Sequence, residues 1–157
     1  MAEPDLCATA DGTLVCVLRT TDGKGLGPML LTSSRDAGET WSPLRLLENF
    51  GVMPRLLTLE NGVTVLSYGR PGVRLLFSAD GAGQCWEHPV TILPGPSMDK
   101  RIDWYSMEAE SCGNNSQLIP LAPDRFIMAY SDFTHKDAAG HVRKAIFVRE
   151  VRVRVKP

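Results

Sequence analysis

The sequence lacks the marks of several large classes of protein. Its 157 residues contain no apolar run long enough to cross a bilayer, and its formal net charge is −1. We therefore expect neither a membrane partner nor a nucleic-acid partner. Residues 1–5 contain neither the basic nor the apolar part of a signal peptide. The compartment is unknown from the sequence, and a cytoplasmic location is expected if Met1 is the native start.

The cysteines argue against a metal site. The four of them, Cys7, Cys16, Cys85 and Cys112, show no C-x-x-C spacing and are not followed by paired histidines. We therefore predict no metal and no cofactor, and we favour free thiols in a reducing compartment. Cys7 and Cys16 fall on the two arms of one predicted hairpin, which leaves a cross-strand pairing open.

What the chain does contain is a series of short apolar stretches separated by turn residues, and this pattern is all-β. Asp11-Gly12 and Asn61-Gly62 are typical of tight hairpin turns. The first unit has predicted strands at 3–8, 13–19, 28–33 and 44–47, and the second at 54–59, 63–70, 73–77 and 90–93. A partial third unit has them at 116–121, 126–130 and 144–155, with a polar loop predicted over 131–142.

Two turn motifs containing a tryptophan follow the third strand of the first two units. The first reads S-x-D-x-G-x-T-W, and the second carries one extra residue, with Cys85 in the place of the threonine. In each motif the short carboxylate can accept backbone N–H bonds, the glycine supplies a positive φ, and the tryptophan ring pins the turn to the sheet. The motif residues are Ser34, Asp36, Gly38, Thr40 and Trp41, then Ser78, Asp80, Gly83 and Trp86.

These motifs resemble the Asp-box of the sialidase (BNR-repeat) β-propellers, and the resemblance extends over nearly the whole chain. The spacing of the two tryptophans fits the roughly 40–50 residues of one four-stranded blade. The resemblance implies an all-β propeller of the six-bladed type, with about three blades in this chain over 1–50, 51–97 and 98–157.

Three blades are too few to close a ring, because propellers usually carry about 4–8. One alternative is that the chain is the C-terminal half of a longer protein whose missing N-terminal blades lie on the same polypeptide. The other is that two copies form a homodimer that completes one propeller. An open half-propeller would expose the apolar flanks of both terminal blades.

The resemblance also implies site residues. Sialidases hold a sugar carboxylate with arginines, whose planar guanidinium gives bidentate bonds and keeps its charge. Glu3 and Arg19 match the family's glutamate beside the nucleophile and one of these arginines, so Glu3 is a candidate catalytic residue. Arg70 matches another arginine of this set. Further candidates for substrate contacts are Arg55, Tyr130 and Asp132.

The third unit departs from the family pattern. The sialidase nucleophile is a tyrosine, but an alignment on residues 116–118 puts Asn115 at its position, and an amide cannot act as this nucleophile. Tyr105 lies nearby in the sequence. The family's N-terminal arginine motif and its acid/base aspartate are both missing from the sequence, which fits a C-terminal half.

Two functions stay open on the sequence alone. The first is an exo-α-sialidase-type glycoside hydrolase, or a fragment of one, that binds a sialic-acid-like acidic sugar through Arg19 and Arg70. The alternative is a non-catalytic glycan-binding or interaction module, with a homodimer of half-propellers as one arrangement. Whether the chain is an enzyme is therefore undecided at this stage.

Overall fold

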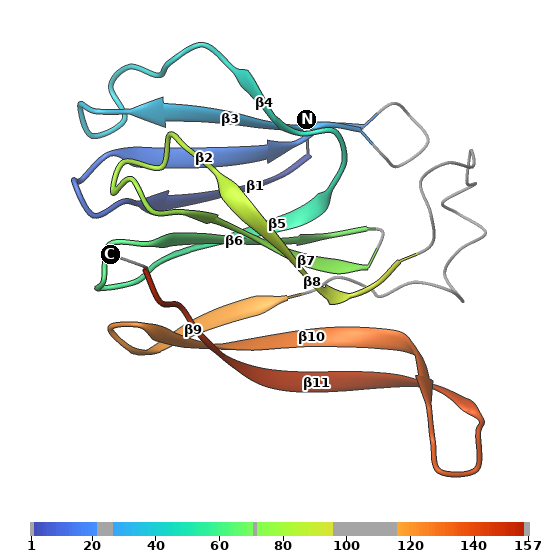
Figure 1. Ribbon diagram of the computed structural model, residues 1–157. Helices are drawn as coiled ribbons and strands as arrows, with labels where there is room; N and C mark the ends of the chain where they lie inside the picture. The colour runs from blue at the N-terminus through green and yellow to red at the C-terminus, as the bar shows by residue number, and fades with distance from the viewer. Residues whose placement is uncertain (1, 22–26, 71, 96–115, 156–157) are drawn as a thin grey trace.

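The computed structural model describes residues 2–21, 27–70, 72–95 and 116–155, and the structural statements that follow concern these ranges. Within them the chain forms eleven strands in three antiparallel sheets, which lie face to face (Figure 1). We call these sheets blade 1, blade 2 and blade 3 in chain order.

Each blade is a meander in which strands that follow one another in sequence pair with one another. Blade 1 has the order β1 (Ala2–Ala8), β2 (Leu14–Arg19), β3 (Met29–Ser34), β4 (Arg45–Glu48). Blade 2 has the order β5 (Val52–Thr58), β6 (Thr64–Gly69), β7 (Val73–Ser78), β8 (Glu87–Leu93). Blade 3 consists in its described part of β9 (Gln117–Ala122), β10 (Arg125–Lys136) and β11 (Val142–Arg152).

The two predicted hairpin turns have the expected chemistry. Gly12 has a φ of 85° and Gly62 a φ of 87°, a region that residues with a Cβ rarely adopt. The Asp11 carboxylate accepts the Thr13 N–H at 2.9 Å, and the Asn61 side-chain oxygen accepts the Val63 N–H at 3.2 Å. These side-chain bonds replace backbone partners that the turn itself cannot provide, and they set the register of the strands that follow.

The core lies between the blades, in two apolar clusters. The first joins Val15, Val17, Met29 and Leu31 of blade 1 to Leu66, Tyr68 and Leu76 of blade 2. The second joins Leu59, Val65, Val73 and Leu75 of blade 2 to Phe126, Met128 and Tyr130 of blade 3. Blade 2 therefore buries both of its faces, whereas blades 1 and 3 each bury one.

Blade 3 differs from the sequence prediction in one respect. The loop predicted from Ser131 was wrong, because β10 continues to Lys136 and pairs with β11 from Arg125↔Arg152 to Lys136↔Val142. The turn is only 137–141, where Asp137 accepts the N–H groups of Ala139 and His141 at 3.0 and 2.9 Å. The polar residues of this stretch alternate along an exposed hairpin, and such a pattern is easily taken for a loop.

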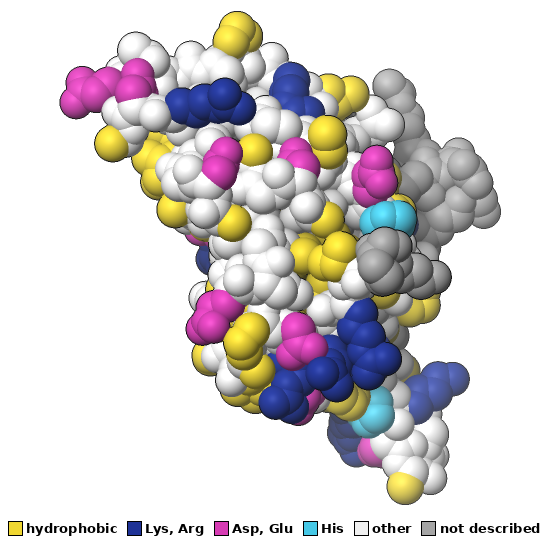
Figure 2. All heavy atoms as spheres, turned by 60° about the vertical axis from the view of Figure 1, so that its left-hand side comes forward, with side chains coloured by type: hydrophobic (Ala, Val, Ile, Leu, Met, Phe, Trp, Pro, Cys, Tyr) yellow, Lys and Arg dark blue, Asp and Glu magenta, His cyan; other side chains and the backbone are white. Residues whose placement is uncertain are grey.

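The basic side of β11 has acidic partners. Arg125 contacts Glu150 at 3.0 Å, and Arg152 contacts Asp124 at 2.6 Å. Figure 2 shows Lys and Arg side chains gathered over the lower part of this face, with acidic side chains among them. The cluster is thus a solvated strand face that neutralises part of its own charge.

Cys7 and Cys16 do not meet. Cys7 pairs with Val15 and Cys16 pairs with Leu6, so the two side chains lie on opposite faces of blade 1. Cys7, Cys16 and Cys85 are free thiols, and Cys112 lies outside the described residues. Burial raises the pKa of the Cys7 and Cys16 thiols, which keeps them protonated and unreactive near neutral pH.

Candidate functional site

One end of the stacked sheets collects the charged residues that the sequence singled out. The first strand of a blade starts where its second strand ends, as the pairs Ala2↔Arg19 and Val52↔Gly69 show. Glu3, Arg19 and Arg70 therefore lie at the same end, on the right in Figure 1. The strands that lead into the two Asp-box turns, β3 and β7, finish at the opposite end. The turn motifs consequently support the fold away from the candidate site.

Glu3 and Arg19 form the best-defined contact at this end. Arg19 Nη1 lies 2.6 Å from Glu3 Oε1, and the two side chains are 15% and 36% exposed. Glu3 Oε2 also accepts the backbone N–H of Met53 at 3.0 Å, so the carboxylate ties blade 1 to blade 2. Glu3 and Met53 both have a positive φ, of 51° and 49°, beside a register shift at the start of their strands. Glu3 therefore holds Arg19 in one orientation.

Two further arginines lie at the same end, on blade 2. Arg70 directly follows β6, and Arg74 pairs with Tyr68 across β6 and β7. The Nε atoms of Arg70 and Arg74 are both buried and have no hydrogen-bond partner among the described residues. A buried N–H donor of a cation without an acceptor is costly, and an oxygen atom of an anionic ligand would relieve it.

Arg74 was not anticipated from the sequence. Its guanidinium lies 4.9 Å from the centre of the Phe50 ring, a cation–π distance. Burial raises the pKa of Tyr68, and the nearby negative charge of Glu48 raises it further, while Arg74 acts in the opposite direction. Tyr68 is therefore a neutral phenol beneath the site, and it is only 1% exposed. The one available signal was a lone charge within the apolar strand at 73–77.

The other predicted contact residues engage in local structure. Arg55 donates from Nη1 to the Pro54 carbonyl at 3.1 Å. Tyr130 is 5% exposed and stacks on Phe147, with 5.8 Å between the ring centres, in the interface of blades 2 and 3. The Asp132 carboxylate accepts the N–H and the hydroxyl of Thr134 at 2.7 and 2.8 Å. The contacts of these three residues are local ones, and their roles as substrate contacts stay predictions.

The predicted nucleophile position lies beyond what the structure covers. Asn115 and Tyr105 are both outside the described residues. Their roles, and the question of which group would attack a glycosidic bond, stay predictions.

The two Asp-box turns are built around their carboxylates. Asp36 accepts the Ser34 hydroxyl at 2.7 Å and both the N–H and the hydroxyl of Thr40, at 2.9 and 2.5 Å. These bonds, led by that of the Thr40 side chain, lower the pKa of Asp36 to about 2. The Trp41 indole N–H donates to the Gly38 carbonyl at 3.1 Å, which closes the turn.

The second turn repeats the plan with an extra residue and with Cys85 in the place of Thr40. Burial opposes ionisation of Asp80, but bonds from the Ser78 hydroxyl and several backbone N–H groups outweigh it and lower the pKa to about 2. Among these donors, the Cys85 N–H lies 2.7 Å from the carboxylate. Thr40 gives Asp36 a hydroxyl bond as well, whereas Cys85 offers no hydroxyl. Trp86 donates to the Gly83 carbonyl at 2.8 Å, as Trp41 does to Gly38.

Neither a metal-binding cluster nor a membrane-spanning helix is found among the described residues. No group of three His, Cys, Asp or Glu side chains in this part of the chain is placed to hold a metal ion. The same residues include no helix with the length and apolarity that crossing a membrane requires.

No protein-family model matches the sequence, and no curated protein matches it either. Solved structures do match. A Dyadobacter fermentans protein of unknown function aligns with a TM-score of 0.62 at 18% identity, over 97% of this chain and 38% of its own. A PL25 ulvan lyase bound to -[GlcA(1-4)Rha3S]- gives 0.61 at 16%, over 95% and 38%. The GH93 α-L-arabinofuranosidase of Fusarium graminearum, in complex with arabinobiose, gives 0.56 at 17%, over 94% and 45%.

These similarities define the fold. The chain is all-β and forms part of a β-propeller, with about three blades present. It spans less than half the length of the solved structures that it matches. Two of the similar proteins, the ulvan lyase and the arabinofuranosidase, act on carbohydrates. The specific relation to sialidases stays a prediction from the Asp-box and arginine motifs.

Proposed function

We propose that this chain carries part of a carbohydrate site of the exo-α-sialidase type, in which Arg19 and Arg70 bind the carboxylate of an acidic sugar. The observation that supports this most is the Arg70 Nε, which is buried and has no hydrogen-bond partner among the described residues. Arg19 lies at the same end of the blades, held by Glu3. A carboxylate placed there would accept charge-assisted bonds from preoriented guanidinium groups.

The similar solved structures favour an acidic saccharide over an anion that contains no sugar. An ulvan lyase and an arabinofuranosidase share this fold, and both were solved with a saccharide bound. In the proposed site Glu3 is mainly a positioning residue. One of its carboxylate oxygens contacts Arg19, and the other accepts the N–H of Met53. Its predicted catalytic role would require one of these bonds to be released.

The binding experiment compares an acidic sugar with a neutral one. N-acetylneuraminic acid and its methyl ester are titrated against the purified protein by isothermal calorimetry or ligand-observed NMR. We expect the acid to bind and the ester to bind weakly. Arg70→Ala should weaken binding of the acid by roughly 10- to 100-fold, the value of a lost charge-assisted hydrogen bond.

Arg35→Ala is the matched control, because Arg35 is exposed beside the first Asp-box turn at the opposite end of the blades. It should bind the acid like the unmodified protein. Equal affinity of the Arg70→Ala variant and the unmodified protein would refute the assignment. Arg70→Lys should restore only part of the affinity, because an ammonium group cannot provide the bidentate geometry.

The second candidate is a non-catalytic glycan-binding or interaction module, with a homodimer as one arrangement. It is favoured by the amide of Asn115 at the predicted nucleophile position. A fluorogenic sialoside separates the two candidates. Steady release of the fluorophore, lost in Arg70→Ala, supports a hydrolase. Binding of the acid without release supports the module.

A further inference from the structure

Blade 1 has an uncovered face that is apolar. We call it flank 1, and it comprises Leu6, Leu14, Cys16, Leu18, Leu30, Trp41 and Leu46. Cross-strand pairing puts Leu6 beside Cys16 and Leu18 beside Leu30, away from the residues that contact blade 2. Leu6 is 52% and Leu46 56% exposed. Thr32 and Ser34 share this face by pairing with Cys16 and Leu14, but both are buried, so the exposed part of the face is largely apolar, which is unusual for a sheet face that remains in water.

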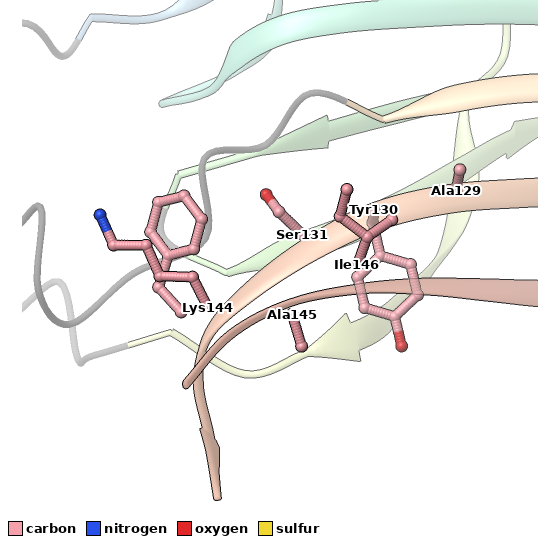
Figure 3. Close-up of a pocket in the computed structure, with 7 residues that line it drawn as sticks. Ala129, Tyr130, Ser131, Lys144, Ala145 and Ile146 are labelled. Carbon is pink, nitrogen blue, oxygen red and sulfur yellow. The ribbon is translucent and has the colours of Figure 1, made fainter. Parts of the chain in front are cut away.

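Blade 3 has an uncovered face as well. We call it flank 3, and it comprises Ile119, Ile127, Ala129, Ser131, Ile146 and Val148. Ile119 pairs with Ile127, and Ala129 with Val148. Ile146 is 80% and Val148 67% exposed. A hollow of about 480 Å³ opens on this blade (Figure 3). It is lined by Ala129, Tyr130, Ser131, Phe133, Lys144, Ala145 and Ile146.

The existing contact between blades 1 and 2 shows what flank 1 is suited to receive. Trp86, in the second Asp-box, packs against the apolar cluster shared with blade 1. A Cβ on Gly83 would come within 2.6 Å of Val15 and 3.0 Å of Thr9, so this turn rests directly on blade 1. The equivalent residues of the first Asp-box have no such support from another blade within the described part of the chain. Trp41 is 41% exposed, and a Cβ on Gly38 would approach Leu14 and Trp41 of its own blade, at 3.8 and 3.9 Å.

Flank 1 and flank 3 correspond to the two opposite sides of one contact between neighbouring blades. Flank 1 carries the residues with which a blade contacts the preceding blade, and flank 3 carries those with which a blade contacts the following one. A flank 3 placed on a flank 1 would therefore repeat the contact that already exists between blades 1 and 2. Flank 1 of the same chain cannot reach its own flank 3, because blade 2 lies between them (Figure 1).

We propose that two copies of this chain associate head to tail, with flank 3 of each copy on flank 1 of the other. The twofold arrangement makes the same contact twice and closes a ring of six blades, within the usual range of about 4–8. The chain covers 38% to 45% of the similar solved structures, so two copies approach the length of one such protein.

The proposal also gives the hollow an occupant. Tyr68, a member of the apolar cluster shared with blade 1, forms a cross-strand pair with Arg74, and the Arg74 guanidinium lies over the Phe50 ring that packs against the same cluster. The equivalents of this pair on flank 1 are Leu18 and Leu30, which form a cross-strand pair in the same place. In the head-to-tail dimer, Leu18 and Leu30 of the second copy enter the hollow beside Ser131 and Ile146. An apolar pair suits this hollow, because most of its lining is apolar.

The test is the solution mass, measured by multi-angle light scattering over a dilution series. We expect a dimer of twice the 17.2 kDa chain mass. Leu46→Glu alters flank 1 and Ile146→Lys alters flank 3, and each should raise the dissociation constant by roughly 100-fold. Both side chains are exposed in the single chain, so each variant should fold, which circular dichroism verifies. Val90→Glu, on the outer strand β8 of blade 2, is the matched control and should remain dimeric.

Mixing the two variants tests the head-to-tail geometry. Leu46→Glu retains a normal flank 3, and Ile146→Lys retains a normal flank 1, so the mixture contains one intact contact that neither variant has alone. Partial recovery of the dimer is expected. A dimer that either variant keeps on its own would refute the pairing of flank 1 with flank 3.

A monomer at the highest soluble concentration would overturn the proposal and point to other blades as the cover of both flanks. Open polymers would overturn the closed ring. The mass measurement involves no sugar, so this inference does not depend on the proposed carbohydrate function. Arg70→Ala should alter sugar binding and leave the mass unchanged, which distinguishes failure of one proposal from failure of the other.

Discussion

Blades 1 and 2 have closely similar strands but different surroundings. All six residues of β6 are buried, whereas β2 alternates between buried and half-buried positions. The half-buried residues of β2 include Leu14, Cys16 and Leu18, which are as apolar as the buried ones. β6 lies between two blades and β2 beside only one. A strand that is apolar on both faces is therefore expected to lie between two neighbouring sheets, even when only one of them is present.

The same contrast holds for the turns. Both Asp-box turns close with an aspartate and a tryptophan, but only the second one rests on another blade. The first turn is also bonded internally, but no other blade packs against it among the described residues. Internal hydrogen bonding therefore specifies the shape of the turn, and the adjacent blade determines how strongly it is coupled to the rest of the fold.

The largest expected effect tests the burial contrast directly. Leu66→Ala removes a side chain that is 0% exposed on β6, and should lower the free energy of unfolding by roughly 2–5 kcal/mol. Leu46→Ala makes the same chemical change on flank 1 and should cost roughly 0.5 kcal/mol in the monomer. Urea denaturation measures both. Equal losses would contradict the distinction between a sandwiched blade and a terminal one.

The two Asp-box glycines give the next effect. Gly83→Ala places a methyl group against Val15 at a φ of 66°, so we expect backbone strain plus overpacking, together roughly 2–4 kcal/mol. At Gly38, which has a φ of 94°, an added methyl group would make only ordinary van der Waals contacts, so Gly38→Ala retains only the backbone strain of about 1 kcal/mol. Thermal denaturation of both variants checks the difference. If a second copy covers flank 1, Gly38→Ala will also weaken the dimer.

The acid sensitivity of the two turns follows from their carboxylates. Asp36 and Asp80 both have a folded-state pKa of about 2, against 3.8 in the unfolded chain. Their stabilisation is therefore fully present above about pH 3.8 and is lost as the pH falls through about 2. Asp80→Asn should flatten the dependence of the thermal midpoint on pH more than Asp36→Asn, because only the second turn is coupled to another blade. The reverse order would argue that the turns unfold independently of their surroundings.

Much of the fold could be predicted from the sequence, because local signals were strong. The hairpin turns at Gly12 and Gly62 and the two Asp-box motifs mark where strands end, and the strands between them are short apolar stretches. The loop predicted from Ser131 failed because an exposed hairpin with polar residues on its outer face looks like a loop. The pairing that extends β10 to Lys136 comes from its long-range partner β11, which no local pattern encodes.

The candidate site was predictable only in part. Arg19 and Arg70 were proposed from the motif resemblance, and Arg19 ends β2 while Arg70 directly follows β6, at the same end of the blades. Arg74 was missed, because its importance depends on a packing contact with Phe50 and on a cross-strand pair with Tyr68. The structural role of Glu3 was also invisible, because its bond to Met53 N–H joins residues of two different blades.

The smallest expected effect concerns the replacement of the threonine by a cysteine in the second turn. Cys85→Thr would give Asp80 the hydroxyl donor that Thr40 gives Asp36, at a position that is exposed and tolerant of the change. We expect a gain of roughly 0.5–1.5 kcal/mol in the free energy of unfolding, measured by urea denaturation. Cys85→Val keeps the shape of threonine without the hydroxyl and should give no such gain. A gain from valine equal to that from threonine would show that β propensity, and not the hydroxyl, separates the two turns. A gain from threonine alone would mean that a hydroxyl bond still adds stability to a carboxylate that already accepts the Ser78 hydroxyl and four backbone N–H groups.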